Sequence, residues 1–189
     1  MLIRALMTSI AFLIAVMPII GMAATPKLVS VYTTTDPKKC VTMSSSDDDK
    51  EGEDQGDYFE GECPGYGSYR IIVTGGDLRY HIDIEHDGIR TSLRSALDQV
   101  SGEFPSLANN TLEWRIAVTD KLVVPYALIY RIGAKDPGNG KKKEVLVVVK
   151  LDGVDSCVFG SVKATGNPKA DSEAKALADK ARTTACEKK

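Results

Sequence analysis

The sequence predicts an α+β protein, in which an antiparallel β-sheet of about five to seven strands carries one C-terminal α-helix and two disulfides. Residues 68–86 alternate between apolar and polar side chains, which is the period of half-buried strands. The run EVLVVVKL at 144–151 is almost continuously β-branched, as expected of a central strand covered on both faces. Residues 170–185 are rich in alanine, lysine and glutamate, which favour a helix.

Residues 1–24 have the pattern of a signal peptide. Arg4 precedes an apolar run from Ala11 to Ile20, and small residues follow up to Ala24. The apolar run is short for a membrane-spanning helix. We therefore expect cleavage before Thr25, export to the periplasm of a bacterium, and one exported domain at 25–189. Contact with a membrane is expected only through the signal peptide, before cleavage.

The charge of the chain is nearly balanced, with 24 basic and 26 acidic residues. Nucleic-acid binders usually carry a basic stripe, so we expect no nucleic-acid partner. No pattern indicates a cofactor. An extracytoplasmic protein or a small ligand is the expected partner.

The four cysteines, Cys40, Cys63, Cys157 and Cys186, all follow the signal peptide, in a compartment where disulfides persist. We expect Cys40 to pair with Cys63, and Cys157 with Cys186. A strand that starts at Cys157, followed by a helix running back over it, returns Cys186 to the level of Cys157. Zinc is not expected, since no CxxC occurs and the histidines are remote from the cysteines in sequence.

Residues 44–57 contain no apolar residue and are expected to form a mobile acidic loop closed by the first disulfide. Asp47, Asp49 and Glu51 have the spacing that begins a calcium-binding loop. Its twelfth position is Tyr58, where a bidentate glutamate is needed, so a solvated run of charges is favoured.

The most informative stretch is the hairpin at 69–86. If Gly75-Gly76 forms a two-residue turn, the apolar residues of the two strands fall on one face. A slip of one residue would turn every side chain over, so the pattern favours this register. The expected pairs are Val73 with Leu78, Ile71 with Tyr80, and Tyr69 with Ile82.

The opposite face of this hairpin is the candidate binding face. It carries Arg70, Arg79, His81, Asp83 and Glu85, with Arg70 expected opposite His81 and Asp83 opposite Ser68. The simpler interpretation is a solvated sheet face.

The other elements follow from local pattern. Pro125 indicates an edge strand or a bulge, and Asn167-Pro168 is expected to start the helix. Lysines in the loop at 134–143 are expected to solubilise a hairpin tip, with a weak basic patch as the alternative. We expect an edge strand at 27–32, a short helix around 93–100, a loop at 102–111, and strands at 112–118, 122–132 and 157–162.

Four segments carry a resemblance to known proteins: the turn Cys63-Pro64-Gly65-Tyr66-Gly67, Gly76-Asp77-Leu78-Arg79, Glu113-Trp114-Arg115, and the strand 145–151. Through them the sequence resembles a group of short exported bacterial proteins. The resemblance implies export and a common fold, and it implies neither a reaction nor a ligand.

The expected function is that of an exported binding or structural module. A small periplasmic hydrolase is the alternative, with the candidate binding face as its site. Asp83 and Glu85 would lie about 7 Å apart there, a spacing that glycosidases also use. His81 has no accompanying nucleophile motif such as GxSxG. A second alternative is an accessory protein similar to the small periplasmic lysozyme inhibitors.

Overall fold

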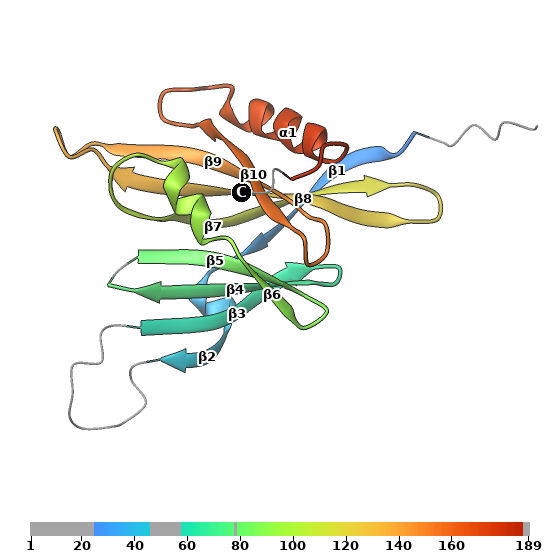
Figure 1. Ribbon diagram of the computed structural model, residues 1–189, viewed down its shortest axis with the longest axis horizontal. Helices are drawn as coiled ribbons and strands as arrows, with labels where there is room; N and C mark the ends of the chain where they lie inside the picture. The colour runs from blue at the N-terminus through green and yellow to red at the C-terminus, as the bar shows by residue number, and fades with distance from the viewer. Residues whose placement is uncertain (1–24, 46–57, 78, 187–189) are drawn as a thin grey trace, which may run out of the picture.

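The protein is built in three layers, as Figure 1 shows. The computed structural model describes residues 25–45, 58–77 and 79–186. Two five-stranded antiparallel sheets pack face to face, and α1 (Ala170–Ala181) covers the outer face of the first. The predicted α+β class, the C-terminal helix and the two disulfides are confirmed. The strands form two sheets instead of the single sheet of about five to seven strands that was predicted. The predicted signal peptide lies outside the described residues.

The first sheet has the strand order β1-β7-β8-β9-β10. All its neighbouring strands are antiparallel. The predicted edge strand at 27–32 is confirmed as β1, and β9 lies inside the sheet as predicted. The strands are β1 (Lys27–Thr34), β7 (Glu103–Val118), β8 (Val123–Lys135), β9 (Lys142–Lys150) and β10 (Cys157–Lys163).

The second sheet has the strand order β2-β3-β4-β5-β6 and contains the hairpin that the sequence identified. A short 3-10 helix, η1 (Pro37–Lys39), leads from β1 in the first sheet to β2 in the second. Ser44 and Ser45, expected in the acidic loop, belong to β2, and the rest of that loop lies outside the described residues. The strands are β2 (Val41–Ser45), β3 (Tyr58–Tyr66), β4 (Tyr69–Gly76), β5 (Arg79–His86) and β6 (Ile89–Ser92).

The main core lies between the two sheets and is centred on the fully buried Trp114. The alternation of β9 places Val147 in this core and Val148 in a second core beneath α1. Small side chains, Ala174 and Ala178 among them, let the helix lie close to the sheet. The predicted two-sided burial of β9 and its cover by the last helix are therefore confirmed.

The predicted register of the β4–β5 hairpin is wrong. Val73 lies opposite Ile82, and Gly76 opposite Arg79, so the turn follows Gly76 instead of containing it. The partner of Val73 is displaced by four residues from the prediction. Because this number is even, Val73 and Ile82 still share the buried face. Leu78 lies outside the described residues.

The physical reason for this register is visible at Gly75. Gly75 lies opposite Tyr80, whose ring covers it: a Cβ on Gly75 would come within 2.2 Å of the ring. The glycine is therefore needed inside the strand, where it admits the ring. Asp77 takes the positive φ of 53° that the turn requires, a conformation that aspartate tolerates better than most residues.

On the polar face of the hairpin the predicted oppositions are wrong as a result. Arg70 lies opposite Glu85, and Asp83 lies opposite Ile72. Ile72 is buried although it lies on the polar face. This face is therefore partly covered instead of being an open solvated surface.

The region after the hairpin also differs from the prediction. The short helix expected around 93–100 is the 3-10 helix η2 (Arg94–Gln99), and the loop expected at 102–111 is the first half of β7. Irregularities in the pairing of β7 with β8 allow this strand to carry Pro105 and the Asn109-Asn110 pair. The C-terminal helix also starts later than predicted, because α1 begins at Ala170. Asn167 still accepts a hydrogen bond from the Lys169 amide just before the helix.

Pro125 lies at a bulge, which is one of its two predicted positions; β8 is an interior strand. The bulge turns Tyr126 toward the helix, while Leu128 and Tyr130 face the core between the sheets. Simple alternation along 122–132 would place all three side chains on one side, so the bulge is the reason that Tyr126 departs from it.

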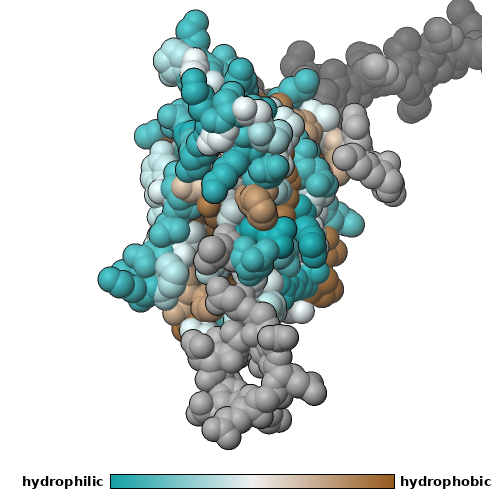
Figure 2. All heavy atoms as spheres, turned by 90° about the vertical axis from the view of Figure 1, so that its left-hand side faces the viewer, coloured by the Kyte–Doolittle hydropathy of each residue, from teal (hydrophilic) through white to brown (hydrophobic). Residues whose placement is uncertain are grey.

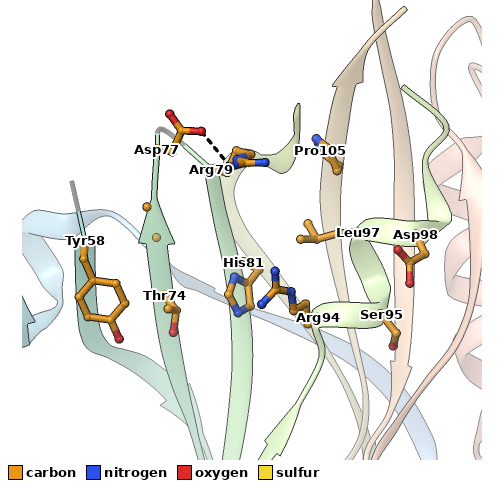
Figure 3. Close-up of a pocket in the computed structure, with 12 residues that line it drawn as sticks. Tyr58, Thr74, Asp77, Arg79, His81, Arg94, Ser95, Leu97, Asp98 and Pro105 are labelled. Carbon is orange, nitrogen blue, oxygen red and sulfur yellow. Dashed lines mark hydrogen bonds and ion pairs between the residues drawn. The ribbon is translucent and has the colours of Figure 1, made fainter. Parts of the chain in front are cut away.

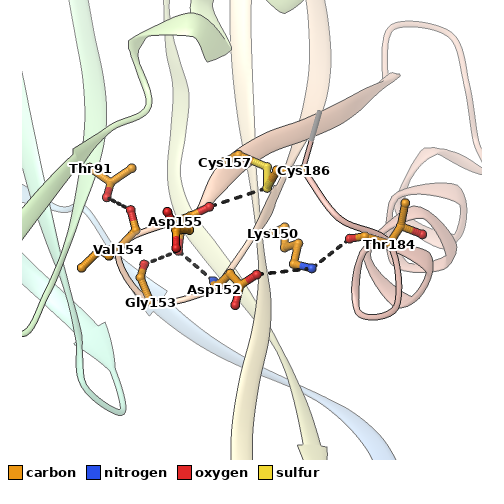
Figure 4. Close-up of a disulfide and its surroundings, with 10 residues drawn as sticks. Thr91, Lys150, Asp152, Gly153, Val154, Asp155, Cys157, Thr184 and Cys186 are labelled. Atoms are coloured by element: carbon orange, nitrogen blue, oxygen red, sulfur yellow. Dashed lines mark hydrogen bonds and ion pairs between the residues drawn. A yellow bond between two sulfur atoms is a disulfide. The ribbon is translucent and has the colours of Figure 1, made fainter. Parts of the chain in front are cut away.

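Both predicted disulfides are formed, and no cysteine is free. Cys40–Cys63 joins the start of β2 to β3. Cys157–Cys186 fastens the segment after α1 to the start of β10, where the Lys150 ammonium also donates a hydrogen bond to the Thr184 carbonyl (Figure 4). A fully oxidised set of cysteines is typical of extracytoplasmic proteins. Across the described ranges, no helix is long and apolar enough to cross a membrane.

Candidate functional site

The residues of the predicted binding face do not converge on one site. Arg70 pairs with Glu62 at 3.4 Å and with Glu85 at 3.7 Å on the outer face of the second sheet. Asp83 is 5% exposed and belongs to a separate network. Arg79 and His81 line a groove beside the hairpin. The predicted set is therefore divided among three places.

Asp83 is held by an arginine that the sequence did not single out. Arg90, on β6, donates from Nε to Asp83 Oδ2 at 2.8 Å. The same guanidinium reaches Glu60 on β3 at 2.9 Å and the Thr74 hydroxyl on β4 at 2.8 Å. Arg90 therefore ties four strands of the second sheet together through one side chain.

The other oxygen of Asp83 is also engaged. Asp83 Oδ1 accepts from the Leu93 amide at 3.0 Å and from the Ser92 hydroxyl at 3.2 Å. These bonds position the start of η2 against β5. A carboxylate with both oxygens occupied by protein donors stabilises the fold and is poorly placed for acid or base catalysis.

The groove lies between the β4–β5 hairpin and η2 and has a volume of about 1100 Å³. Figure 3 shows β3, β4 and β5 on one side and η2 on the other. The surrounding end of the molecule is mainly hydrophilic, with small apolar areas (Figure 2). The side chains that line the groove include Tyr58, Thr74, Asp77, Arg79, His81, Arg94, Ser95, Leu97, Asp98 and Pro105.

Arg94 is placed in the groove by the burial of its neighbours on η2. Leu93 and Ala96 are each 1% exposed and anchor the segment in the core, which leaves Arg94 on the outside. Its side chain makes no hydrogen bond or ion pair with any other residue in the described ranges. In Figure 3 the guanidinium points across the groove toward His81.

His81 is half-buried on β5 and faces the same groove. Burial lowers the pKa of its imidazole, and Arg94 and Arg90 lower it further, while Asp83 opposes the change. The imidazole is therefore neutral at pH 7. Like Arg94, it has no hydrogen-bond partner among the residues that the structure describes.

The remaining cation of the groove is already partnered. Arg79 pairs with Asp77 at 2.8 Å, and its guanidinium carbon lies 5.8 Å from the centre of the Phe104 ring. Across the groove, the Tyr58 hydroxyl donates to Glu60 at 2.6 Å. That bond, followed by the pairing with Arg90, lowers the pKa of the Glu60 carboxyl against the opposing effect of burial.

A second polar cluster lies under α1 and was not predicted. Arg115 on β7 is 7% exposed and donates to Asp179 on α1 from Nη2 at 2.9 Å. The Tyr126 hydroxyl donates to the same carboxylate at 2.5 Å. Burial and this hydrogen bond raise the pKa of Tyr126 to about 12. All three groups are satisfied by one another, so the cluster docks the helix onto the sheet.

The described part of the chain contains no group of three or more histidine, cysteine, aspartate or glutamate side chains placed to hold a metal ion. His81 and His86 lie on opposite faces of β5, and His86 packs against Tyr69 with ring centres 4.6 Å apart and ring planes tilted by 44°. The calcium interpretation of Asp47, Asp49 and Glu51 concerns residues outside the described ranges.

No protein-family model, curated protein or solved structure matches this chain. The resemblance to short exported bacterial proteins stays a prediction.

Proposed function

We propose that this protein is an exported, periplasmic binding module whose ligand places an anionic oxygen group, a carboxylate or a phosphate, between Arg94 and His81. The observation that carries the proposal is the pair of unpartnered side chains in the groove. An arginine without an internal partner offers a rigid set of five donors suited to such groups. A small molecule or an exposed segment of an extracytoplasmic protein could supply the anion.

An anionic ligand is favoured over a cationic one by the arginines beside His81. Arg94 and Arg90 both lower the pKa of the imidazole, in addition to burial and against the opposing effect of Asp83. A bound anion would accept hydrogen bonds from Arg94. The neutral imidazole can in addition donate or accept one hydrogen bond, depending on its tautomer.

Binding is preferred to the hydrolase alternative because of what the acidic residues already do. Asp83 is occupied by Arg90, Ser92 and the Leu93 amide, and Glu85 lies 3.7 Å from Arg70. A hydrolytic pair would need one carboxyl or imidazole beside a nucleophile or a positioned water. An accessory role like that of the small lysozyme inhibitors remains a further proposal, which the same groove could serve.

The test is an NMR titration of the mature, oxidised protein with sodium phosphate and sodium glucuronate at constant ionic strength, with glucose as the uncharged control. We expect shifts concentrated at Arg94, His81 and Ser95, with dissociation constants in the millimolar range for such fragments. Arg94→Gln should abolish them. The matched control is Arg70→Gln, which removes an exposed arginine outside the groove. Shifts spread evenly over the surface, or unchanged in Arg94→Gln, would overturn the proposal.

A further inference from the structure

A second hollow in the surface lies beside the β8–β9 hairpin. It has a volume of about 540 Å³ and is bounded by this hairpin, by the segment that follows η2 and by the end of β10. In Figure 1 the tip of the β8–β9 hairpin and η2 reach the same end of the molecule. We call it the lysine cleft, because Lys141, Lys142, Lys143 and Lys163 line it. Its lining residues are all described by the structure, and none of them lines the Arg94 groove.

The lysine cleft is basic, although the chain as a whole has a formal net charge of -2. Its four lysines face two carboxylates, Asp136 and Glu144. Both carboxylates are already paired, because Lys143 Nζ lies 2.7 Å from Asp136 and Lys142 Nζ lies 2.8 Å from Glu144. The two other lysines supply positive charge that the cleft itself does not neutralise.

These two lysines come from different elements of the first sheet. Lys141 belongs to the β8–β9 turn, and Lys163 ends β10, where it lies opposite Val145 of β9. Neither side chain makes an ion pair or a hydrogen bond within the described ranges. Lys141 precedes Val145 by four residues, which corresponds to about 13 Å along an extended strand. Two separate anionic groups therefore suit the cleft better than one.

The turn that carries Lys141 is held in place by its own hydrogen bonds. Asp136 Oδ1 accepts from the Gly138 amide at 2.8 Å and from the Asn139 amide at 3.3 Å. The Lys141 carbonyl accepts from the Asp136 amide at 2.9 Å, and the Lys141 amide donates to Asn139 Oδ1 at 2.9 Å. The main chain at Lys141 is thus ordered before any ligand binds, which lowers the entropic cost of binding.

The floor of the cleft is apolar and its wall is polar. Val100 is 6% exposed and Val145 is 9% exposed, and both belong to the core between the sheets. Beside them, the side chains of Gln99 and Ser101 make no hydrogen bond to any residue that the structure describes. A few polar groups above an apolar floor are typical of sites for small molecules.

We propose that the lysine cleft binds a small organic dianion, whose two carboxylate or phosphate groups pair with Lys141 and Lys163 and whose apolar middle lies on Val100 and Val145. Hydrogen bonds between an ammonium and such groups are charge-assisted and short. The two lysines are exposed, so binding weakens as salt screens them. The inference goes beyond the proposed function and does not depend on it, because Arg94 takes no part in this cleft.

The experiment is an NMR titration of the mature, oxidised protein with suberate at constant ionic strength. Octanoate, which has the same number of carbons and one carboxylate, is the matched monoanion, and hexane-1,6-diyl bisphosphate is the phosphate probe. We expect shifts at Ser101, Lys141, Lys163 and Thr165, with millimolar dissociation constants. Suberate should bind there about fivefold more tightly than octanoate, since an exposed ion pair contributes little. Binding of either dianion supports the proposal, and the tighter one identifies the acidic group.

Matched variants separate the cleft from general surface charge. Lys141→Gln, Lys163→Gln should weaken suberate binding about tenfold or more. The control Lys38→Gln, Lys121→Gln removes two exposed lysines that lie outside the cleft and have no ion pair in the described ranges, and it should bind normally. Both variants should keep the unfolding midpoint of the unaltered protein.

The Arg94→Gln variant keeps this inference distinct from the proposed function, because it should leave the shifts at Ser101 and Thr165 unchanged. No shift at the cleft with either dianion would overturn the proposal. Equal weakening in the two double variants would overturn it as well, by showing that general surface charge attracts the probe. Equal affinity of the cleft for octanoate and suberate would overturn the assignment of a dianion.

Discussion

Two arginines of this molecule, Arg115 under α1 and Arg94 on η2, have opposite environments. Arg115 is 7% exposed, and Asp179, Tyr126 and Ser30 surround it. Arg94 is exposed and makes no side-chain bond within the described residues. Removing a cation from water is costly unless it is paired, so Arg115 had to be satisfied by the fold itself. Arg94 stays in contact with water, so the fold need not supply a partner for its guanidinium.

The comparison distinguishes polar groups that are satisfied within the fold from polar groups that are not. Asp83 and Arg90 resemble the Arg115 cluster, since each is occupied by partners from neighbouring strands. His81 resembles Arg94, since its ring meets no hydrogen-bonding partner in the ranges described. Substitutions in the first class should alter the free energy of unfolding, and those in the second should alter binding.

Reduction should have the largest effect, because each disulfide restrains one of the two regions. Cys157–Cys186 fastens the end of the helix that carries Asp179, and Cys40–Cys63 fastens the sheet that carries the groove. Loops of 23 and 29 residues correspond to about 3 kcal/mol each by chain entropy. Urea unfolding with and without dithiothreitol measures the loss. An unchanged midpoint after reduction would show that the disulfides contribute little.

Breaking the Arg115 cluster should be the next largest effect. Asp179→Ala leaves Arg115 and Tyr126 without their shared acceptor, and we expect a loss of about 2 to 3 kcal/mol in the free energy of unfolding. Asp171→Ala is the matched control, because this exposed carboxylate of α1 lies 3.7 Å from Arg131. Its loss should be within about 0.5 kcal/mol. Equal losses in both variants would contradict the assignment.

The groove should respond to pH through His81. Its pKa is lowered in the folded protein, so the unfolded chain takes up the proton first as the pH falls. The contribution of His81 is therefore complete above the ordinary histidine pKa of about 6.5 and is lost progressively below it. Unfolding midpoints between neutral and mildly acidic pH should fall less in His81→Gln than in the unaltered protein. Phosphate should raise the pKa of His81 in an NMR titration, and no change would argue against anion binding beside this ring.

The smallest effect on stability is expected for Arg94→Ala. Since its side chain has no internal partner, the free energy of unfolding should change by no more than about 0.5 kcal/mol. Arg115→Ala, which leaves Asp179 and Tyr126 without their cation, should lower it by several times as much. Urea unfolding of the two variants side by side measures the contrast. Similar losses would show that Arg94 also contributes to the fold.

The candidate site was predicted in part. His81 and Arg79 were placed on the polar face by alternation alone, and both line the groove. The roles of Arg90 and Arg94 were not predicted. The residues beside them in sequence form no pattern that indicates which side chains from other strands lie near each guanidinium. The one available signal for Arg94 was the buried spacing of Leu93 and Val100, which leaves it outside.

The sequence by itself determined the α+β class, the two-sided burial of β9, its cover by the alanine-rich helix and both disulfide pairs. The class, the burial and the helix follow from the periodicity and composition of short segments. The disulfides follow from the expected compartment and from the predicted order of strand and helix. Tertiary structure decided the division into two sheets, the register set by Tyr80 over Gly75, and the meeting of His81 with Arg94. These three features depend on packing and hydrogen bonding between segments that are far apart in the chain. A local sequence pattern does not indicate which distant segments will be in contact.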